Sequence, residues 1–481
     1  MELINRVLDV SPVESLAAHE ATGGGSGLRA ADAGPDVVMA VLEASGLRGR
    51  GGAGFPTATK WQSILDYTSG QITPTVVVNA AEGEPGSFKD RAIIDANPYR
   101  VLEGALIAAV TIGADEVVIA TKRRFTHQVA RLRSAIAECA DAGWAPGVTV
   151  DIVEGPDEYL YGEETALLAV VEGRQPFPRV APPWRRGVDG SSDLGPGDAP
   201  ADAEDTARTP PVLVNNVETL AHVALIMANG ADWFRQHGTP ESPGTLVCTI
   251  TGHLARSGVA EVAMGTPLRA VIDHVGGRPM VGEITAVMSG VSNAVVPASL
   301  LDTPLTYEAM AVVGSGLGTG GFIVFDSSVD PVAVAAGVSR FLAVESCGQC
   351  TPCKQDGVAI SIALGHVRAG TTTGDELVTI EHRIETIETG ARCFLATQHR
   401  RVVESLLELY PDAFIDHATR VARPSEPYLI AELEGFTDGP DRRPIYDERH
   451  QTKQPDWTFD LTDSGVSPAD RLGRSSGANP R

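Results

Sequence analysis

The pattern of hydrophobic residues predicts alternating strands and helices in the first half of the chain. The run of β-branched residues at 75–79 is typical of a buried strand, and the runs at 116–120 and 148–153 predict further strands. Apolar residues recur at helical spacing between these runs, at 102–110 and 128–142. Because strands that alternate with helices form parallel sheets with helices on their faces, we expect an α/β fold here.

The pattern changes near residue 241. Strand-like runs at 245–250 and 322–325, with a helical run at 267–274 between them, predict a small α+β module. The chain from 331 to 420 then shows helical spacing throughout, which predicts a bundle. Its expected helices span 332–345, 356–368, 375–390 and 398–410.

Two other stretches lack a core-forming pattern. Residues 185–210 are rich in Gly, Asp, Pro and Ala, and we interpret them as a mobile surface insertion. Residues 421–481 are polar and rich in Pro, and we interpret them as an acidic, partly ordered tail. Residues 1–34 include the glycine-rich stretch at 23–27 and are expected to form an N-terminal tail.

Composition narrows the classes of partner and compartment. The 481 residues are too many for one core, so several domains are expected. With 38 Lys and Arg against 62 Asp and Glu, the net charge is −24, which disfavours binding to nucleic acid and to anionic membranes. No apolar run reaches the length of a membrane-spanning helix. Six cysteines in so long a chain do not form a disulfide framework, so we expect a reducing, cytoplasmic setting.

Four of the cysteines form a pattern that points to metal chemistry. Cys347, Cys350 and Cys353 have C-x2-C-x2-C spacing, and Cys393 follows further along the chain. Four thiolates are the number that a [4Fe–4S] cluster requires. There are two alternatives: a structural zinc site, although zinc usually takes two C-x2-C pairs, and cysteines that simply pack. The other two cysteines are interpreted as core residues, namely Cys139 and Cys248.

A glycine-rich loop follows the first helical run. It contains a G-x-G-x-x-G match at Gly49, Gly51 and Gly54, but the usual dinucleotide fingerprint follows a strand rather than a helix. Bare backbone N–H groups, together with the charges of Arg50 and Lys60, nevertheless suit a phosphate cradle. A flexible surface loop is the alternative. A second glycine run at 314–321 also suits phosphate on pattern, although it lacks the Lys-Ser/Thr of a P-loop.

Carboxylates follow two of the expected strands. Glu82 and Glu84 come just after the strand at 75–79, where α/β sheets place their ligands. Glu163 and Glu164 lie at a junction between a loop and a helix. They are interpreted either as charges that favour a helix N-terminus or as the lining of a cofactor pocket.

Several motifs together resemble one family, the flavin- and NADH-binding subunit of respiratory complex I. Its relatives include the diaphorase subunits of NAD-dependent formate dehydrogenases and NAD-linked hydrogenases. The motifs occur in family order over about residues 35 to 420. They are SGLRGRGGAGFPT at 45–57, NAAEGEPGSFKDR at 79–91, YGEETALL at 161–168, VNNVETLA at 214–221, and ESCGQCTPC at 345–353 with Cys393.

The resemblance implies a Rossmann-like domain that binds FMN and NAD(H), a ubiquitin-like module and a helical bundle that carries a [4Fe–4S] cluster. The expected limits are 1–34 for an N-terminal tail, 35–240 for the FMN and NADH domain, 241–327 for the ubiquitin-like module, 328–420 for the iron–sulfur bundle and 421–481 for the acidic tail.

The same resemblance assigns residues to each ligand. Those implied for FMN are Gly49, Arg50, Lys60, Asn79, Glu82, Tyr159, Gly162, Asn215, Asn216 and Thr219. Those implied for NAD(H) are Gly51, Gly52, Ala53, Phe55, Glu84 and Glu164, with Glu163 included in the cofactor-binding set. Glu84 and Glu164 would orient the nicotinamide and are the catalytic candidates. Trp184 stands where the family has a Phe beside the adenine.

Three positions depart from the family pattern. Ala81 replaces an Asp, Ser63 stands where some relatives have an aromatic residue, and Ala58 replaces a Gly. These differences motivate a second hypothesis, an electron-transfer subunit that no longer binds nucleotide. A non-redox interaction protein with a structural zinc is a third.

The leading hypothesis is a diaphorase module of a larger complex. It would pass hydride between NADH and FMN, and single electrons between FMN and the cluster. The implied partners are a thioredoxin-like [2Fe–2S] subunit and a larger catalytic subunit of the iron–sulfur, molybdenum or nickel type. We expect a cytoplasmic location, with a place at the inner face of a membrane complex left open.

Overall fold

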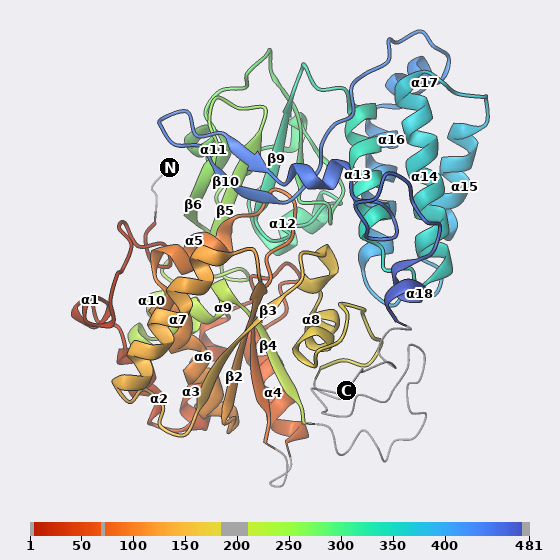
Figure 1. Cartoon of the computed structure of the whole chain (residues 1–481). Helices are drawn as coiled ribbons and strands as arrows, with labels where there is room; N and C mark the ends of the chain where they lie inside the picture. Colours follow the sequence, from red (N-terminus) through yellow and green to blue (C-terminus); the bar gives the residue numbers. More distant parts are fainter. Residues whose placement is uncertain (1–3, 69–72, 184–209, 474–481) are drawn as a thin grey trace.

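A computed structural model describes residues 4–68, 73–183 and 210–473. It contains a parallel sheet, a second sheet of mixed direction and a helical bundle, which lie against one another (Figure 1). The fold class expected from the sequence is confirmed: a Rossmann-like α/β core is followed by a small α+β module and by helices.

The parallel sheet has the strand order β3-β2-β1-β4. All three pairs of neighbours are parallel, and Val77 lies opposite both Val118 and Val214. The strands are β1 (Thr75–Ala80), β2 (Glu116–Lys122), β3 (Thr149–Gly155) and β4 (Val212–Asn216). Parallel strands place all their carboxyl ends at one edge, so the loops after β1, β3 and β4 meet there.

Helices cover both faces of this sheet, as the alternation along β1 shows. Val76 and Val78 belong to the large core beneath α6 and α9, whereas Val77 belongs to a smaller core beneath α8. The helices of this part are α3 (Pro35–Ser45), α4 (Thr57–Tyr67), α5 (Lys89–Ala96), α6 (Pro98–Ile112), α7 (Thr126–Asp141), the 3-10 turn η1 (Tyr159–Gly162), α8 (Glu164–Val171), α9 (Val217–Asn229) and α10 (Ala231–Phe234).

The second sheet has the order β6-β5-β9-β7-β8, with β5 parallel to β9 and antiparallel to β6. Leu268, Val271 and Ile272 occupy one face of α11 and join the core of this module. Its elements are β5 (Thr245–Gly252), β6 (Gly258–Ala263), α11 (Leu268–Val275), β7 (Ile284–Ser289), β8 (Val296–Pro297), η3 (Ala298–Leu300), α12 (Tyr307–Val312) and β9 (Gly321–Asp326).

The bundle follows directly. Its helices are α13 (Pro331–Glu345), α14 (Thr351–Ala369), α15 (Glu376–Thr386), α16 (Leu395–Leu409) and α17 (Pro411–Ala418). α15 ends at Thr386, four residues before the expected end, and the loop that follows carries Cys393 to the start of α16. The loop between α13 and α14 carries Cys347 and Cys350, so the two cysteine-bearing segments come from different parts of the bundle.

The N-terminal residues differ from the expected tail. The backbone N–H groups of Arg6, Val7 and Leu8 all donate to one carboxylate oxygen of Glu261, at 2.8, 2.7 and 3.0 Å. Val7 is fully buried. Two short helices then pack on the sheet domain, α1 (Leu16–Ala21) and α2 (Ser26–Ala31).

The C-terminal residues also differ from the expected tail, because residues 429–457 pack across the first sheet domain and the bundle. Ile430, Leu433 and Trp457 are buried, and Glu432 forms ion pairs with Lys122 and Arg124. The polar composition concealed this packing because charged side chains supply much of the contact. The elements of this segment are β10 (Leu433–Phe436), β11 (Pro444–Tyr446), η4 (Glu448–Gln451) and α18 (Pro468–Leu472).

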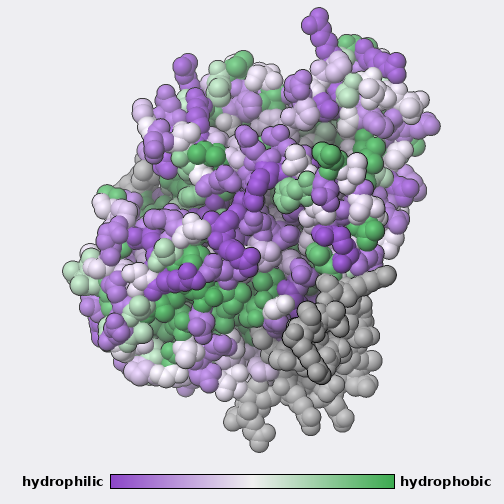
Figure 2. Space-filling model, viewed as in Figure 1, coloured by the Kyte–Doolittle hydropathy of each residue, from purple (hydrophilic) through white to green (hydrophobic). Residues whose placement is uncertain are grey.

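The surface agrees with the acidic, polar composition. The face seen in Figure 2 is largely hydrophilic, and a cluster of hydrophobic residues lies over the parallel sheet. No helix in the described ranges has the length and apolar character needed to cross a bilayer. Residues 184–209, which include Trp184 and almost all of the expected insertion, lie outside the described residues.

The contact between α6 and α9 yields a stability prediction. A Cβ atom on Gly104 would lie 1.9 Å from the carbonyl oxygen of Leu220, so Gly104→Ala must push the two helices apart. We expect the free energy of unfolding to fall by about 3 kcal/mol, measured by urea denaturation. Gly365→Ala is the control, because a Cβ there meets nothing within 4 Å. It should stabilise α14 by roughly 0.5 kcal/mol or more. Equal effects of the two substitutions would contradict this account of the contact.

Candidate functional site

A cleft of about 650 Å³ lies where the sheet domain, the second sheet and the bundle meet. This volume is within the range of small-molecule sites. Its sheet-domain wall contains Gly51, Gly52, Ala53, Asn79, Glu82, Glu84, Asp90, Tyr159, Gly162, Glu163 and Asn216. The opposite wall comes from the second sheet and the bundle, with Ser292, Asn293, Tyr307, Gly316, Leu317, Gly318, Thr319, Phe394, Gln398 and Arg401. The cleft therefore forms at the carboxyl edge of the parallel sheet.

The glycine loop is closed by a backbone hydrogen bond and contains glycines with positive φ. It connects α3 to α4, and the N–H of Gly49 donates to the carbonyl of Phe55 at 2.8 Å, which closes the loop. Gly52 and Gly54 have φ values of +124° and +64°, and a Cβ on Gly54 would lie 2.4 Å from the Tyr307 ring. The loop thus needs glycine at these positions. Phe55 is 51% exposed and is not among the residues that line the cleft.

The side chain of Arg50 corrects one expectation. Its guanidinium is buried and donates to the carbonyl oxygens of Arg48, Pro243 and Thr245 at 2.9, 3.0 and 3.1 Å. Its backbone N–H donates to the Thr219 hydroxyl at 2.9 Å. The guanidinium therefore joins the glycine loop to the start of β5 and does not face a phosphate in the cleft. Sequence alone suggested otherwise because Pro243 and Thr245 lie almost 200 residues away.

Lys60, Glu164 and Asn215 also have protein partners, and none of the three lines the cleft. Lys60 forms an ion pair with Glu164, which joins the start of α4 to the start of α8. The indole N–H of Trp61 donates to the side-chain oxygen of Asn215 at 2.8 Å, and Trp61 is fully buried. These contacts fix α4 against the carboxyl end of β4.

The two glutamates after β1 have different environments. Glu82 forms an ion pair with Arg91 at 2.9 Å and accepts a hydrogen bond from the Ser87 hydroxyl at 2.7 Å. Burial raises the pKa of Glu82, but the charges of Arg91 and Lys89 and the hydrogen bonds from Arg91 and Ser87 together outweigh burial, and the pKa is lowered. Glu82 is therefore an ionised residue that supports the loop.

Glu84 accepts hydrogen bonds from three groups. They are the Tyr159 hydroxyl at 2.6 Å, the Val291 N–H at 2.7 Å and the Ser292 hydroxyl at 2.5 Å. Burial raises the pKa of Glu84, and these hydrogen bonds only partly offset the rise. The carboxylate thereby links the loop after β1 to the second sheet at the floor of the cleft.

A buried polar network supports the cleft, and sequence reasoning assigned no role to its central residue. The Lys89 ammonium lies 2.7 Å from Asp90, 3.1 Å from the Asn216 side-chain oxygen and 3.0 Å from Glu218. The Asn79 side chain donates to the carbonyl of Gly162 at 2.9 Å. The signal was present in the Lys-Asp-Arg that ends the motif at 79–91.

The second glycine run, at 314–321, lies across the cleft from the first. Gly318 and Thr319 are the nearest neighbours of the space beside Gly52, at 3.9 Å from a Cβ placed there. The Thr319 hydroxyl oxygen is buried and has no hydrogen-bond partner among the described residues. Two facing glycine-rich loops and an unpaired hydroxyl fit an extended ligand that carries polar groups, as FMN and NAD(H) do.

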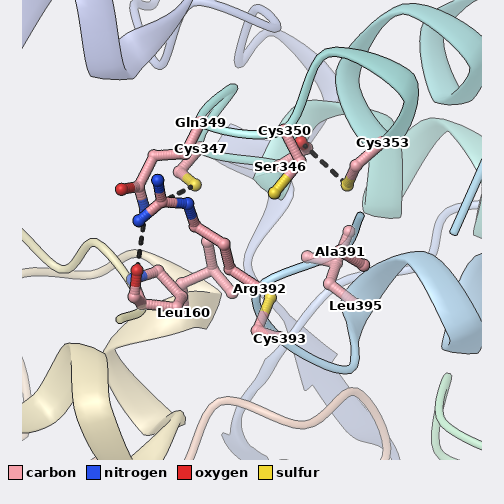
Figure 3. A pocket seen from close by; sticks show the side chains of 11 residues that line it. Leu160, Ser346, Cys347, Gln349, Cys350, Cys353, Ala391, Arg392, Cys393 and Leu395 are labelled. Atoms are coloured by element: carbon pink, nitrogen blue, oxygen red, sulfur yellow. Dashed lines mark hydrogen bonds between the residues drawn. The ribbon is translucent and has the colours of Figure 1, made fainter. Parts of the chain in front are cut away.

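The four cysteines surround a separate, smaller pocket. Cys347, Cys350 and Cys353 approach from the start of α14, and Cys393 approaches from the loop before α16. Figure 3 shows their sulfur atoms directed into the same space. Gly348, with φ at +83°, permits the turn between the first two.

The surroundings of the sulfurs fit an iron–sulfur cluster. The Gln349 amide donates to the Cys347 sulfur at 3.5 Å, and the Ser346 hydroxyl lies 3.3 Å from the Cys353 sulfur (Figure 3). Hydrogen bonds to sulfur are typical of such sites. Four thiols around one pocket, with hydrogen bonds to two of the sulfurs, fit the ligand set of a [4Fe–4S] cluster.

Burial disfavours the charged forms of two side chains at this pocket, Cys353 and Lys354. Burial raises the pKa of the Cys353 thiol to about 11, a cost that binding to iron would reverse. Lys354 donates to the carbonyl oxygens of Ala343 and Ser346 at 3.0 and 2.9 Å, and burial lowers its pKa to about 8.

The cleft and the cysteine pocket share a wall. Leu160, Cys393 and Leu395 line both of them. Leu160 belongs to η1, whose neighbours Tyr159 and Gly162 face the cleft. The thickness of one side chain therefore separates the two sites.

Comparisons with known proteins agree with this arrangement. A family model described as the Nuo51 FMN-binding domain matches residues 42–225, and one described as the NADH-ubiquinone oxidoreductase-F iron–sulfur binding region matches residues 333–417. The chain is 33% identical to an F subunit of NADH-quinone oxidoreductase from Rhizobium meliloti, over 86% of this chain and 96% of that protein. It is 35% identical to the corresponding F subunit from Streptomyces coelicolor, over 84% and 88% of the two chains.

A solved structure is also similar. The crystal structure of NAD+-reducing [NiFe]-hydrogenase in the H2-reduced state matches with a TM-score of 0.72 and 32% identity. The match covers 85% of this chain and 66% of that chain, so this chain spans just under two thirds of the hydrogenase chain.

The corrected role of Arg50 can be tested. Arg50→Lys removes the planar group that donates to three carbonyl oxygens. We expect the free energy of unfolding to fall by about 3 kcal/mol in urea denaturation, because a single ammonium cannot satisfy all three acceptors. The folded fraction should retain its flavin in absorbance at 450 nm, because the guanidinium does not line the cleft. Loss of flavin at unchanged stability would return Arg50 to phosphate binding.

Proposed function

The chain belongs to the family of NADH-quinone oxidoreductase F subunits, and from this we infer that it is the NADH-, FMN- and [4Fe–4S]-binding electron-transfer component of a larger oxidoreductase complex. One observation in the structure carries the inference. A nucleotide-sized cleft and a four-cysteine pocket share the wall formed by Leu160, Cys393 and Leu395. Electrons can therefore pass between the two sites through a single layer of side chains.

The cofactors and the protein have separate tasks. A bound FMN would supply the exchange between a hydride, which carries two electrons, and single electrons, because a flavin can exchange either two electrons or one. The protein supplies position and shields the site from water. The bare backbone of Gly51, Gly52 and Ala53 allows close approach of the stacked rings, as does the facing run at Gly318.

We assign the residues of the cleft as follows. Asn79, Gly162, Glu163 and Asn216 hold the flavin, and the Lys89 ammonium contributes positive charge through Asn216. Thr319 offers its unpaired hydroxyl to the ligand. Glu84 orients the nicotinamide from the floor of the cleft, while Glu164, which does not line the cleft itself, acts from the start of α8 through its ion pair with Lys60.

The cluster ligands in this proposal are Cys347, Cys350, Cys353 and Cys393. They are the four cysteines that ring the pocket. The remaining two, Cys139 and Cys248, are buried in the cores of the first two parts, as the sequence indicated.

The partners follow from the chemistry. A chain that binds NADH, a flavin and one cluster needs another subunit to take or supply the electrons. We propose a thioredoxin-like [2Fe–2S] subunit and a larger catalytic subunit of the iron–sulfur, molybdenum or nickel type. The similarity to an NAD+-reducing [NiFe]-hydrogenase supports a partner that reduces NAD+ through this chain, and the similarity to quinone-linked subunits supports the reverse direction. A cytoplasmic site, at the periphery of a membrane complex in the quinone-linked case, suits either assignment.

One purification tests the whole assignment. The chain is isolated anaerobically with its bound partners, which are identified by mass. Flavin, iron and acid-labile sulfide are measured, together with NADH–ferricyanide activity. After the partners are separated from it, we expect one flavin and about four iron atoms per copy of this chain. A protein that holds zinc instead of iron, or that has neither flavin nor NADH oxidation, would contradict the proposal. A protein with flavin and iron but no NADH oxidation would favour a nucleotide-independent electron carrier.

Cys350→Ser separates the two sites. Loss of one ligand should remove the cluster, seen as loss of iron and of absorbance near 420 nm, and electrons should no longer reach the partner subunit. NADH–ferricyanide activity should remain, because Cys350 does not line the cleft. Cys139→Ala is the control, because Cys139 is a buried cysteine outside the pocket. Full transfer to the partner in Cys350→Ser would refute the ligand assignment.

A further inference from the structure

Glu345 connects the cysteine loop (residues 346–350, which include Cys347 and Cys350) to the wall between the two sites. It is the last residue of α13, two positions before Cys347, and its side chain is 3% exposed. One carboxylate oxygen accepts the backbone N–H of Tyr159 at 3.0 Å. Tyr159 begins η1, which contains Leu160 of the shared wall. Any shift of Glu345 is therefore transmitted to both sites.

Tyr159 extends this connection into the cleft. Its hydroxyl donates to Glu84 at 2.6 Å, and its ring packs edge-on against Phe341 of α13, with centroids 5.3 Å apart. A chain of direct contacts thus runs from the cysteine loop through Glu345 and Tyr159 to the nicotinamide side of the cleft.

The C-terminal segment holds the other end of Glu345. The Lys453 ammonium lies 2.7 Å from the second carboxylate oxygen, and its side chain is 7% exposed. His450 lies 3.2 Å from the same oxygen, and its ring stacks on Phe341 at 4.7 Å. Among the described residues, Lys453 is the one Lys or Arg that forms an ion pair with Glu345. Without it, His450 would be the one basic side chain left beside the buried Glu345 carboxylate among the described residues.

We propose that Lys453 is a positioning residue for electron transfer: by holding Glu345, it fixes the Tyr159–Leu160 wall between the flavin cleft and the cysteine pocket. This inference rests on the proposed function. The step concerned moves single electrons from reduced FMN to the oxidised cluster. Reduction of the flavin by hydride would take up one proton from water. Two such transfers, with the partner subunit re-oxidising the cluster after each, would return the flavin to its oxidised form and release two protons, so that each NADH yields NAD+, one proton and two electrons.

Lys453 acts without touching either cofactor site, since it lines neither pocket. Its loss removes the ion pair that holds Glu345 and leaves the carboxylate free to turn away from the Tyr159 N–H. Small misplacements of reacting groups cost large factors in rate. The effect should therefore fall on the transfer between the sites and spare the binding of NADH.

Three variants of the full chain test this. Lys453→Met removes the charge, and Lys453→Arg keeps a cation within reach of Glu345. Arg449→Met is the matched control: Arg449 lies four residues earlier in the same segment and pairs with Asp447 and Asp157 at 2.7 and 3.1 Å, but it does not contact Glu345. Each protein is purified anaerobically. Four quantities are measured: FMN and iron content, the KM for NADH with ferricyanide, the EPR spectrum of the reduced cluster, and the rate of cluster bleaching by NADH in stopped flow.

We expect Lys453→Met to keep its FMN, iron and KM, while cluster reduction slows by roughly 10- to 100-fold and the EPR line shape changes. Lys453→Arg should recover most of the rate, and Arg449→Met should match the wild type. Wild-type bleaching and EPR in Lys453→Met would overturn the proposal. So would loss of FMN or iron in step with the rate, which indicates a general role in folding.

A milder substitution tests the proposal if Lys453→Met does not fold. Lys453→Gln keeps a hydrogen-bond donor without the charge, and intermediate slowing is expected, whereas a wild-type rate would again overturn the proposal. Failure of the proposed function looks different: the wild-type chain itself would then lack flavin, iron or NADH oxidation.

Discussion

A charge that is removed from water must meet an opposite charge or several hydrogen bonds, and this constraint holds the parts of the molecule together. Lys89 lies between Asp90 and Glu218 beneath the cleft. Lys122 is fully buried and pairs with Glu432, 310 residues away. Glu345 joins Tyr159 to Lys453 at the edge of the cysteine loop. Each pair connects segments that would otherwise be free to separate, and both pockets form where such segments meet.

The sequence predicted the strands and the cysteine pocket because their signals are local. The β-branched runs predicted β1, β2 and β3, of which β1 and β2 are buried and β3 is a half-exposed edge strand. Four cysteines in this spacing are typical of a cluster site. The residue motifs identified the family, and the cleft is lined by Gly51, Asn79, Glu84 and Tyr159, four of the residues that the resemblance assigns to a ligand. Each strand and each motif is recognised from a few consecutive residues, although the fold brings the motifs together from distant parts of the chain.

The features that the sequence did not predict depend on distant partners. Arg50 has the composition of a phosphate-binding loop around it, yet it donates to carbonyl groups at the start of β5. The glycine run at 314–321 was recognised as a possible phosphate loop, but its position across the cleft from Gly52 was not predicted. That position depends on the packing of the second sheet. The C-terminal segment was expected to be a tail because its polar residues gave no apolar period, whereas ion pairs and hydrogen bonds fix it.

The way this C-terminal segment covers the cysteine loop has a consequence for the order of assembly. The N–H of Ala469 donates to the carbonyl of Cys347 at 2.8 Å, and a Cβ on Gly348 would meet Ser467 at 2.4 Å. These residues leave the ribosome more than a hundred positions after the first three cysteines. Domains fold largely as they emerge, so the bundle forms while this side of the loop is still open. We expect iron and sulfide to be delivered before the chain end closes over the loop, because the chain end is synthesised last.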